Sequence, residues 1–411
     1  MFGNMENSME DREFESLVDR MDAVVARTPT QFHRALTDRI DWHNRLLGVK
    51  GARGAGKSTL LRQHVKEQFG GVGEKALYVS MDDLWFANHS LLDLVDWHRR
   101  QGGTHIFIDE IHYLKPWQQV IKNIYDFYPD ISVVYTGSSM LQLDYKGADL
   151  SRRQLVYELP GLSFREYLNY ELEEDFAAVS LEELLAKHHE MAAAIVGKFN
   201  VLKHFKDYQE YGFYPFYKED KEGYAMRLRE VVKLVLEIDL PAIEEVTPAT
   251  VVKAKKMLSI LAESVPQTPK MAVLYRELET DRNQGLKILK ALARAGLLQL
   301  LSSEHATFKD MSRPDKIYLE NTNLMAALAP EINAGCRRET FFLNQLRSAG
   351  YAVTYPRCGD FLVDGKWLFE VGGKGKSFEQ IKDISDSYVV NDEVELTRGN
   401  KVPLWLFGFL Y

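Results

Sequence analysis

The stretch GARGAGKST, Gly51 to Thr59, decides the fold of the first part of the chain. It matches the pattern G-x-x-x-x-G-K-[ST] in full, and it follows the short apolar run RLLGV, Arg45 to Val49. Glycines here allow backbone N–H groups to close around phosphate oxygens, and the start of the next helix adds its positive dipole end. The residues predicted to form this phosphate-binding loop are Gly51, Ala52, Arg53, Gly54, Ala55, Gly56, Lys57, Ser58 and Thr59.

Two side chains of this loop have specific predicted roles. Lys57 would reach the β- and γ-phosphates of a nucleotide, and the hydroxyl of Ser58 would bind magnesium. The predicted ligands are therefore ATP and Mg²⁺, although the sequence does not separate ATP from GTP. The segment before the first strand, Ile40 to Asn44, would line either a base pocket or the core.

Short apolar runs alternate with helical patterns around the loop. RLLGV is followed by ALYVS (Ala76 to Ser80), HIFID (His105 to Asp109) and SVVYTG (Ser132 to Gly137). The segments between them are long enough for crossover helices, which is typical of βαβ units in a parallel sheet. LVYELP, Leu155 to Pro160, is a candidate fifth strand. An α/β domain is therefore predicted.

Two acidic residues end the third apolar run. Asp109 would hold magnesium through water, and Glu110 would orient or deprotonate an attacking water molecule. A pair of solvated acids is the alternative. The run that ends in Thr136-Gly137-Ser138-Ser139 would lie beside both motifs, so that hydroxyls such as that of Ser139 would sense the γ-phosphate. A strand exit rich in hydroxyl groups fits these residues equally well.

Composition and charge limit the classes of function. The net charge is −8, which does not favour a general nucleic-acid binder. The charge is uneven: residues 161–250 hold ten Lys/Arg against eighteen Asp/Glu, whereas residues 251–300 hold nine against four. Two cysteines without a CxxC pair argue against structural zinc and for a reducing compartment. The polar N-terminus and the lack of long apolar runs predict a cytoplasmic protein with no membrane partner.

The middle of the chain is predicted to be helical. Helical patterns run from Ser163 to Pro248, and three shorter ones followed by the apolar run KIYLEN lie between Val251 and Asn323. Helices followed by a β-hairpin fit a winged-helix domain. Its third helix, Gln284 to Ala295, would be capped at its C-terminus by Gly296. This helix would carry Lys287, Lys290 and Arg294 on one face, where they would contact DNA phosphates. A merely solvated face, or packing against a neighbouring domain, is the alternative.

Near the C-terminus, DFLVDGKWLFEVGGKGK (Asp360 to Lys376) predicts a hairpin that carries acids and lysines, and PLWLFGFLY (Pro403 to Tyr411) predicts a terminal strand. A two-residue turn would pair Val363 with Lys366 and separate Asp360 from Glu370. A three-residue loop with Gly365 in the left-handed conformation, which pairs Leu362 with Lys366, would place the two acids on one face. Because the apolar residues Phe361, Val363, Trp367, Phe369 and Val371 are all odd-numbered, a common core face requires the odd-length loop.

These acids are arranged as in nucleases of the PD-(D/E)xK type. Asp360 and Glu370 would hold a second metal ion, and Glu339 on an upstream helix would complete the site. The lysine is displaced, because position i+2 after Glu370 is a glycine. Lys374 and Lys376 are the two substitutes. A working nuclease, a degenerate domain used for binding and an ordinary hairpin therefore all remain open.

The P-loop, the Asp-Glu strand and the TGSS strand together resemble the additional-strand ATPases of the AAA+ and STAND-related group. More narrowly, DRIDWHNRLLGVKGARGAGKSTLL and DFLVDGKWLFEVGGK resemble a bacterial and archaeal family of predicted AAA ATPases. YGFYP, Tyr211 to Pro215, resembles the Gly-x-Pro turn of the lid in that group. The resemblance implies sheet order 5-1-4-3-2. It also implies an arginine finger near the end of the core, for which Arg153 and Arg152 are the candidates.

The resemblance also implies the domain organisation. The expected parts are a polar N-terminal extension (1–30), an ATPase core (31–160), a helical lid (161–250), a winged helix (251–330) and a PD-(D/E)xK nuclease-like domain (331–411). The predicted function is magnesium-dependent ATP hydrolysis coupled to rearrangement of the lid, winged helix and C-terminal domain. A nucleotide-gated DNA nuclease, and a rarely hydrolysing switch that acts through a protein partner, are the alternatives.

Overall fold

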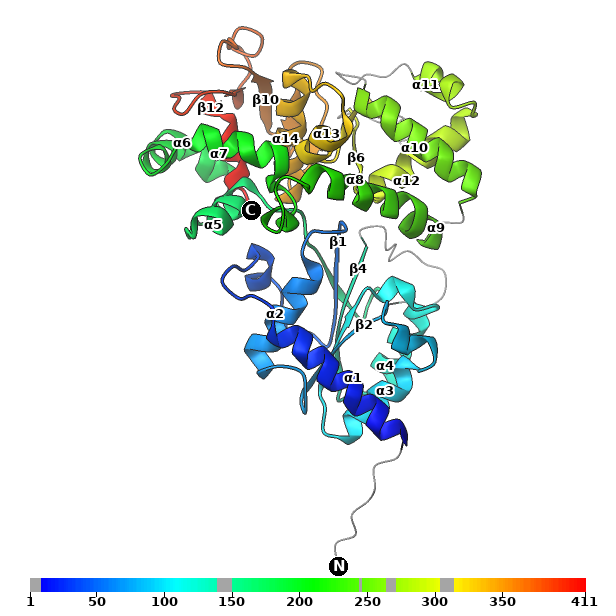
Figure 1. Ribbon diagram of the computed structural model, residues 1–411. Coiled ribbons are helices and arrows are strands. Elements are labelled where there is room, and N and C mark those ends of the chain that lie inside the picture. The colour runs from blue at the N-terminus through cyan, green and yellow to red at the C-terminus, as the bar shows by residue number, and fades with distance from the viewer. Residues whose placement is uncertain (1–8, 139–149, 244–245, 264–270, 304–313) are drawn as a thin grey trace, which may run out of the picture. The chain divides into compact units, whose positions relative to one another are not determined.

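The computed structural model describes residues 9–138, 150–243, 246–263, 271–303 and 314–411. They form two compact units, Met1–Leu159 and Pro160–Tyr411 (Figure 1). The border lies one residue before the predicted end of the ATPase core at residue 160, and the predicted domain boundaries stay predictions. The predicted lid, winged helix and nuclease-like domain all lie within the second unit. Among the described residues, no helix has both the length and the apolar character needed to cross a membrane.

The first unit is built on a five-stranded parallel sheet in the order β2-β3-β4-β1-β5. Read from the other edge, this is the order 5-1-4-3-2, so that prediction is confirmed. The strands and main helices are β1 (Leu46–Gly51), α2 (Lys57–Phe69), β2 (Ala76–Ser80), α3 (Leu91–Arg100), β3 (His105–Asp109), α4 (Trp117–Phe127), β4 (Ser132–Ser138) and β5 (Leu155–Glu158). Single 3-10 turns add η1 (Ala35–Asp38), η2 (Leu84–Ala87) and η3 (Ile111–Tyr113).

Residues 1–30 were expected to form a polar extension without regular structure. That prediction is wrong for residues 9–26. These residues form helix α1 (Met9–Ala26), which packs against α2 and β2. Its apolar residues Phe14, Leu17, Met21 and Val25 are all buried in the core of the unit. They recur at helical spacing, so one stripe of the helix is apolar although most of its residues are polar. Because β2 is an edge strand, α1 also covers part of an otherwise exposed sheet edge.

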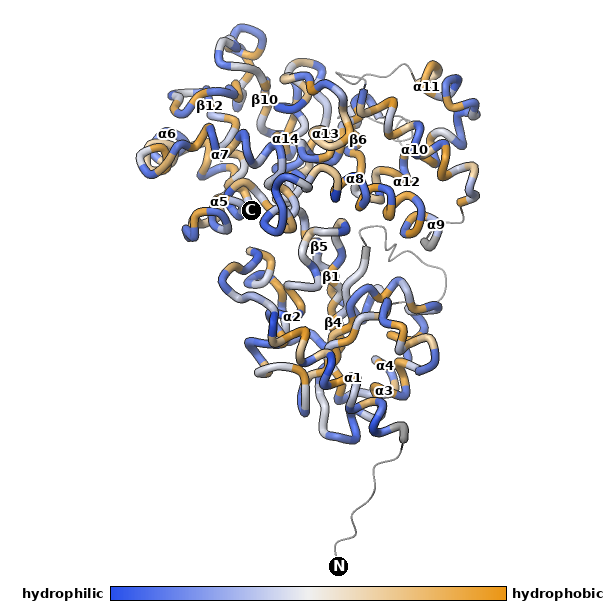
Figure 2. The backbone as a smooth tube through the Cα atoms, in the orientation of Figure 1, coloured by the Kyte–Doolittle hydropathy of each residue, from blue (hydrophilic) through white to orange (hydrophobic). Residues whose placement is uncertain are grey.

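The second unit begins with the helices that the sequence predicted after Ser163. They are α5 (Phe164–Leu172), α6 (Leu181–Val196), α7 (Val201–Asp207), η4 (Tyr208–Gly212), η5 (Pro215–Lys218), α8 (Tyr224–Leu234), η6 (Val235–Asp239) and α9 (Leu240–Ile243). Hydrophobic and hydrophilic residues alternate along α8 and the helices near it (Figure 2). Such alternation is expected of helices that cover a core with one face.

Three helices and a two-stranded antiparallel sheet follow, in the order expected for the segment 251–330. They are α10 (Pro248–Glu263), α11 (Met271–Glu277), α12 (Arg282–Arg294), β6 (Leu298–Leu301) and β7 (Lys316–Leu319). Gly296 has a φ of 69° just beyond the end of α12, as its predicted capping role requires. The element order therefore matches the prediction, while the assignment to the winged-helix class stays a prediction.

The C-terminal part is a mixed five-stranded sheet in the order β12-β11-β10-β9-β8, preceded by two helices. Its elements are α13 (Thr322–Leu328), α14 (Ala334–Ser348), β8 (Val353–Thr354), β9 (Phe361–Val363), β10 (Trp367–Gly372), β11 (Ser387–Asn391), β12 (Lys401–Pro403) and η8 (Leu404–Phe409). The run PLWLFGFLY was expected to be a strand, but only Pro403 belongs to β12, and the rest of the run begins as the 3-10 turn η8. Full burial of Trp405, Phe407 and Phe409 explains why the run is apolar without alternation.

The predicted lid and the predicted C-terminal domain share one core. The rings of Phe205 on α7 and Phe341 on α14 lie 4.8 Å apart, and those of Phe164 on α5 and Phe409 on η8 lie 6.2 Å apart. The carbonyl oxygen of Tyr411 accepts hydrogen bonds from Ser163 Oγ (2.7 Å) and Arg165 Nε (2.9 Å). Contacts across so much sequence mean that the two parts do not fold as separate cores.

Replacing Leu17 by alanine tests the structural role of α1. Leu17 is 1% exposed, so the truncation should lower the free energy of unfolding of the first unit by about 3 kcal/mol. Urea unfolding followed by tryptophan fluorescence measures the change. Asp19→Ala is the matched control, because Asp19 is exposed on the same helix. Equal stability of both variants and the wild type would show that α1 is dispensable.

Candidate functional site

The predicted phosphate-binding loop connects β1 to α2. Gly54 and Gly56 have positive φ values of 85° and 98°, which L-residues rarely adopt, and Gly56 caps the N-terminus of α2. Lys57 is the first residue of the helix and is buried. Its Nζ donates hydrogen bonds to the carbonyl oxygens of Gly51 (3.0 Å) and Ala52 (3.1 Å). The lysine side chain therefore folds back toward the start of its own loop.

Arg34 is a second cation at this loop, and the sequence did not predict it. It is buried, and its NH1 donates a hydrogen bond of 2.6 Å to the carbonyl oxygen of Ala55. An arginine so far from the P-loop in sequence carries no motif that would reveal the contact. This hydrogen bond holds a carbonyl group of the loop and connects the segment before η1 to the phosphate-binding loop.

Asp109 lies at the end of β3 and is held by the two neighbouring strands. Its Oδ2 accepts a hydrogen bond of 2.9 Å from the hydroxyl of Tyr78 on β2, and its Oδ1 accepts one from Thr136 Oγ1 on β4. Burial and the nearby carboxylate both raise the pKa of Tyr78, so the phenol stays a proton donor. Thr136 was predicted to face a nucleotide phosphate, but in this structure its hydroxyl contacts the acidic pair.

Glu110 follows Asp109 in an unusual backbone conformation. Its φ is 50°, and its N–H donates a hydrogen bond of 3.0 Å to Thr136 Oγ1. One carboxylate oxygen, Oε2, lies 3.2 Å from Nδ1 of the buried His112. Backbone strain of this kind occurs at functional sites, where surrounding contacts hold it. His112 was a candidate that the sequence analysis passed over, although it stands two residues after Glu110.

The other residues predicted for this site are Arg153, Arg152 and Ser139. The side chain of Arg153 forms a salt bridge with Asp126 of α4, with Nε 3.1 Å from Oδ1. Its role as an arginine finger, like that of Arg152, stays a prediction. Ser139 lies outside the described residues. β4 lies between β1 and β3, as predicted for the strand that ends in TGSS.

The arrangement defines a nucleotide-binding domain of the P-loop class, with an additional strand between the P-loop strand and the acidic strand. Residues 43–168 match the family described as "AAA domain". Residues 202–334 match the family described as "Domain of unknown function (DUF8612)". The first match covers the sheet with its P-loop and acidic pair, so this part of the chain is similar to AAA domains in sequence, and its strand order fits the same class.

Similar proteins add the following. The uncharacterized protein MJ1637 of Methanocaldococcus jannaschii is 27% identical over 403 residues, covering 89% of this chain and 84% of that protein. The AMPPCP-bound DnaA of Aquifex aeolicus is 14% identical over 71% of this chain and 88% of its own, with a TM-score of 0.27. A katanin structure is 18% identical over 47% of this chain and 71% of its own, with a TM-score of 0.24. These TM-scores are too low to support an argument.

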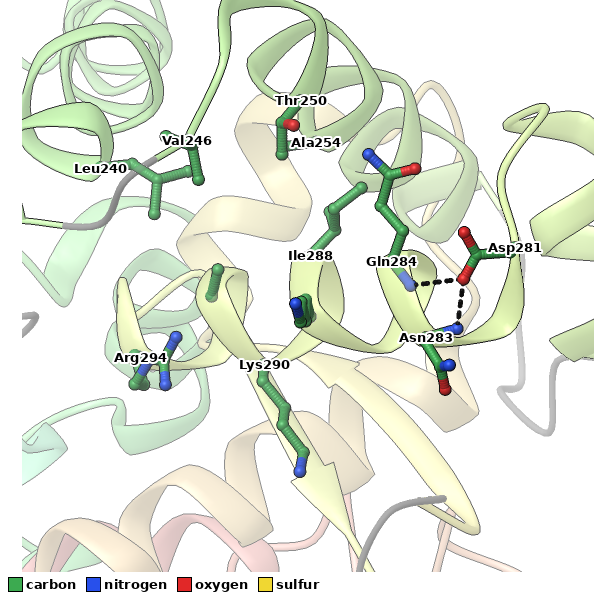
Figure 3. Close-up of a pocket in the computed structure, with 12 residues that line it drawn as sticks. Leu240, Val246, Thr250, Ala254, Asp281, Asn283, Gln284, Ile288, Lys290 and Arg294 are labelled. Atoms are coloured by element: carbon green, nitrogen blue, oxygen red, sulfur yellow. Dashed lines mark hydrogen bonds between the residues drawn. The ribbon is translucent and has the colours of Figure 1, made fainter.

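The basic residues predicted to contact DNA lie on α12. Lys287, Lys290 and Arg294 are all exposed and line a cavity of about 760 Å³ (Figure 3). The structure therefore places them together on one helix face, as their spacing predicted. It adds a concave surface beside them that the spacing did not predict.

The C-terminal hairpin has the predicted three-residue loop, shifted one residue toward the C-terminus. Val363 pairs with Trp367 and Phe361 with Phe369, which leaves residues 364–366 in the loop and Leu362 opposite Leu368 rather than Lys366. Gly365 has the predicted left-handed conformation, with a φ of 65°. The odd loop length is therefore confirmed and the exact register was wrong, because Val363 stays paired in β9 and Lys366 enters the loop.

Lysines contact all three predicted acids of this region. Nζ of Lys316 on β7 lies 3.0 Å from Glu339 Oε2 and 3.7 Å from Asp360 Oδ1. Lys376, rather than the exposed Lys374, forms a salt bridge with Glu370. Burial alone would lower the pKa of Lys316, but the two carboxylates outweigh it and raise that pKa. Lys316 was not predicted, because it lies on a strand outside the hairpin.

The carboxylates predicted to bind a second metal ion already have other partners. Glu339 also accepts a hydrogen bond of 2.6 Å from the Tyr318 hydroxyl, and Asp360 Oδ2 accepts one of 2.9 Å from the N–H of Val371. Within the described ranges, no group of three or more His, Cys, Asp and Glu side chains is placed to hold a metal ion. A second metal at Asp360 and Glu370 therefore stays a prediction, and it would have to compete with Lys316 and Lys376 for these carboxylates.

Lys316→Met tests whether these contacts are structural. The change leaves Glu339 and Asp360 without their cation, so the free energy of unfolding of the second unit should fall by about 2 kcal/mol, given partial exposure. Chemical denaturation measures it. Lys374→Met is the matched control, because Lys374 is exposed and forms no side-chain hydrogen bond or salt bridge within the described part of the chain. A variant as stable as the wild type would mean that Lys316 contributes nothing.

Proposed function

We propose that this chain binds ATP with magnesium at the P-loop of its first unit and hydrolyses it. The observation that carries the proposal is the combination of two features on one parallel sheet. The P-loop follows β1, and the Asp109-Glu110 pair follows β3, with Thr136 of the intervening β4 hydrogen-bonded to both acids. The match of residues 43–168 to the AAA domain supports the same reading.

The residues of this site fit a magnesium nucleotide. The left-handed Gly54 and Gly56 open the loop, and the buried Lys57 supplies a cation on its inner side. Ser58 and Asp109 are the oxygen ligands that would hold the metal, directly or through water. Bound magnesium would neutralise charge on the phosphate oxygens.

In the hydrolysis step, this chain's own residues position the reactants and move one proton. Lys57 would hold the β- and γ-phosphates, and Glu110 would accept a proton from the attacking water at its carboxylate. The hydrogen bond from its backbone to Thr136 and the contact with His112 fix the start and the end of the Glu110 side chain. Held at both ends, the carboxylate keeps one orientation, which is what a general base requires.

Glu110→Gln should reduce ATP turnover by about 100-fold or more while ATP binding is retained, because the amide cannot accept the proton. Lys57→Ala should weaken binding itself. Release of inorganic phosphate and binding of a fluorescent ATP analogue measure the two effects. Glu74→Gln is the control, since Glu74 is exposed in the same unit.

Two other outcomes would change the proposal. Undiminished turnover in Glu110→Gln would exclude Glu110 as the base. Tight ATP binding by the wild type without turnover would favour the switch that acts through a protein partner. Stimulation of turnover by duplex DNA would instead support a nucleic-acid partner.

We further propose that the nucleotide cycle is coupled to a rearrangement involving the lid, the predicted winged helix and the C-terminal part. The domain order motivates this coupling. Because the lid helices and the C-terminal sheet share a core, the helices from α10 to α12 are the part expected to change position relative to them.

Fluorescence transfer within the second unit tests this coupling. Dyes on the exposed Cys358 and on an Arg282→Cys variant would report on the C-terminal part and on α12. The transfer efficiency should change when ATP is added, and it should not change when Lys57→Ala is also present. An unchanged efficiency in a protein that hydrolyses ATP would contradict the coupling.

DNA cleavage by the C-terminal part remains the second prediction from the sequence. The short hairpin that carries Asp360 and Glu370 is the observation in its favour. Magnesium-dependent cleavage that Glu370→Ala abolishes is the result that it requires. A lack of cleavage by the wild type would leave these acids with the structural role that their lysine partners indicate.

A further inference from the structure

A concave surface of mixed chemistry lies beside α12. The cavity of about 760 Å³ falls within the range of roughly 300–1,000 Å³ that is typical of binding pockets. Its apolar lining consists of Leu240 on α9, Val246 shortly before α10, Ala254 on α10, and Ile288 and Ala291 on α12. Figure 3 shows Leu240 and Val246 on one side of this space and Ile288 and Arg294 on the other. The cavity therefore has an apolar lining on both sides.

Cations border the same cavity. Lys287, Lys290 and Arg294 recur along α12 at the spacing of successive turns, over a length of about 10 Å. In the described part of the chain, neither Lys287 nor Lys290 takes part in a salt bridge. Among the described residues, no carboxylate therefore neutralises either ammonium group.

One carboxylate also borders the cavity, but it is already engaged. Asp281 Oδ1 accepts hydrogen bonds from the backbone N–H groups of Asn283 (2.7 Å) and Gln284 (2.9 Å) at the start of α12 (Figure 3). These bonds lower the pKa of Asp281, so the group stays ionised as a helix cap. It lies at the opposite end of α12 from Arg294. Lys287 and Lys290 are therefore cations on this border that form no ion pair with a described carboxylate.

We propose that this cavity binds an amphipathic helix of a partner protein. Acidic residues of that helix would face Lys287, Lys290 and Arg294, and apolar residues between them would enter the cavity. Charge complementarity selects an acidic partner, and the apolar lining selects one with a hydrophobic face. Spacing of three and four residues along α12 matches the spacing of acidic residues on one face of a second helix.

Three observations favour a protein helix over duplex DNA at this place. DNA backbone contacts need cations but gain nothing from an apolar cavity, whereas a helix can bury side chains there. The chain as a whole carries a net charge of −8, which disfavours a long polyanion more than a short acidic segment. In addition, the Gln284 side-chain oxygen already accepts a hydrogen bond of 2.8 Å from the hydroxyl of Thr280, which limits base readout at the start of α12.

The test compares three fluorescein-labelled probes by anisotropy, without nucleotide so that ATPase activity has no influence. The first is a synthetic helix of about four turns with leucines on one face and glutamates on the other. The second has lysines in place of the glutamates, and the third is a short DNA duplex. We expect saturable binding of the acidic helix alone, weakened by added salt.

Variants separate the two parts of the cavity. The double variant Lys287→Glu/Lys290→Glu should weaken binding of the acidic helix at least about tenfold, by replacing attraction with repulsion. Val246→Ser should weaken it about fivefold, because it removes apolar lining without changing charge. Arg282→Glu, on the same helix but outside the cavity, should leave the affinity unchanged. Circular dichroism of each variant checks that it is folded.

The opposite results would overturn the proposal. Failure of the acidic helix to bind the wild type would do so, as would binding that neither cavity variant changes. Binding of the DNA duplex that is lost in the double lysine variant and retained in Val246→Ser would replace the proposal with a phosphate-backbone contact. Because ATP hydrolysis is measured separately, failure of this proposal would leave the proposed function of the first unit unaffected.

Discussion

In the proposed nucleotide site, the hydroxyl group of Thr136 holds the two acidic residues together. It accepts the N–H of Glu110 at 3.0 Å and donates to the carboxylate of Asp109, so that one side chain of β4 fixes both acids at the end of β3. This is possible only because β4 lies between β1 and β3 with a parallel register. A shift of that register by one residue would turn Thr136 to the other face of the sheet. Strand pairing deep in the core thus determines the geometry of the acids at its edge.

In the second unit, a buried asparagine has a comparable role. Asn323 on α13 is fully buried, and its Oδ1 accepts the N–H of Phe213 (2.8 Å) and the hydroxyl of Tyr224 (2.6 Å). Its amide donates to the carbonyl oxygens of Tyr208 (2.9 Å) and Gln209 (3.1 Å). All these partners belong to the segment predicted as a lid. A buried amide with every hydrogen-bonding group satisfied specifies one packing arrangement, and loss of any partner would be costly. The predicted lid is therefore built into the second unit rather than attached to it.

Sequence patterns predicted the elements of the first unit closely, because its strands are short apolar runs with motifs at their ends. The P-loop and the Asp109-Glu110 pair were predicted from local sequence alone. Helix α1 was missed although Phe14, Leu17, Met21 and Val25 stand at helical spacing, because its polar majority suggested an extension. The run PLWLFGFLY was assigned to a strand because it is apolar. That assignment failed because an apolar run without alternation fits a buried helical turn equally well.

Contacts between distant segments could not be predicted in this way. Tyr78, Arg34 and Lys316 carry no motif, and each acquires its partner only when separate elements come together. The hairpin register illustrates an intermediate case. Parity of the apolar residues required an odd loop, and the structure has one. A loop of residues 363–365 and one of residues 364–366 both satisfy that parity, and they differ only in whether Val363 or Lys366 leaves the strand pairing.

The C-terminal acids show how one charge problem can have two solutions. Glu339, Asp360 and Glu370 are largely shielded from water, and carboxylates in such places need nearby positive charge. A divalent cation would concentrate two charges at one point, whereas Lys316 and Lys376 supply one each from β7 and from the segment after β10. The five groups together carry one net negative charge, so a metal ion would have to displace at least one lysine to bind tightly. Lys316 also fastens β7 to α14 and to the start of β9, so its displacement would loosen the hairpin of β6 and β7. Metal binding at these acids would thus compete with the packing of the second unit, whereas the nucleotide site in the first unit, with Lys57 on its own loop, involves no such competition.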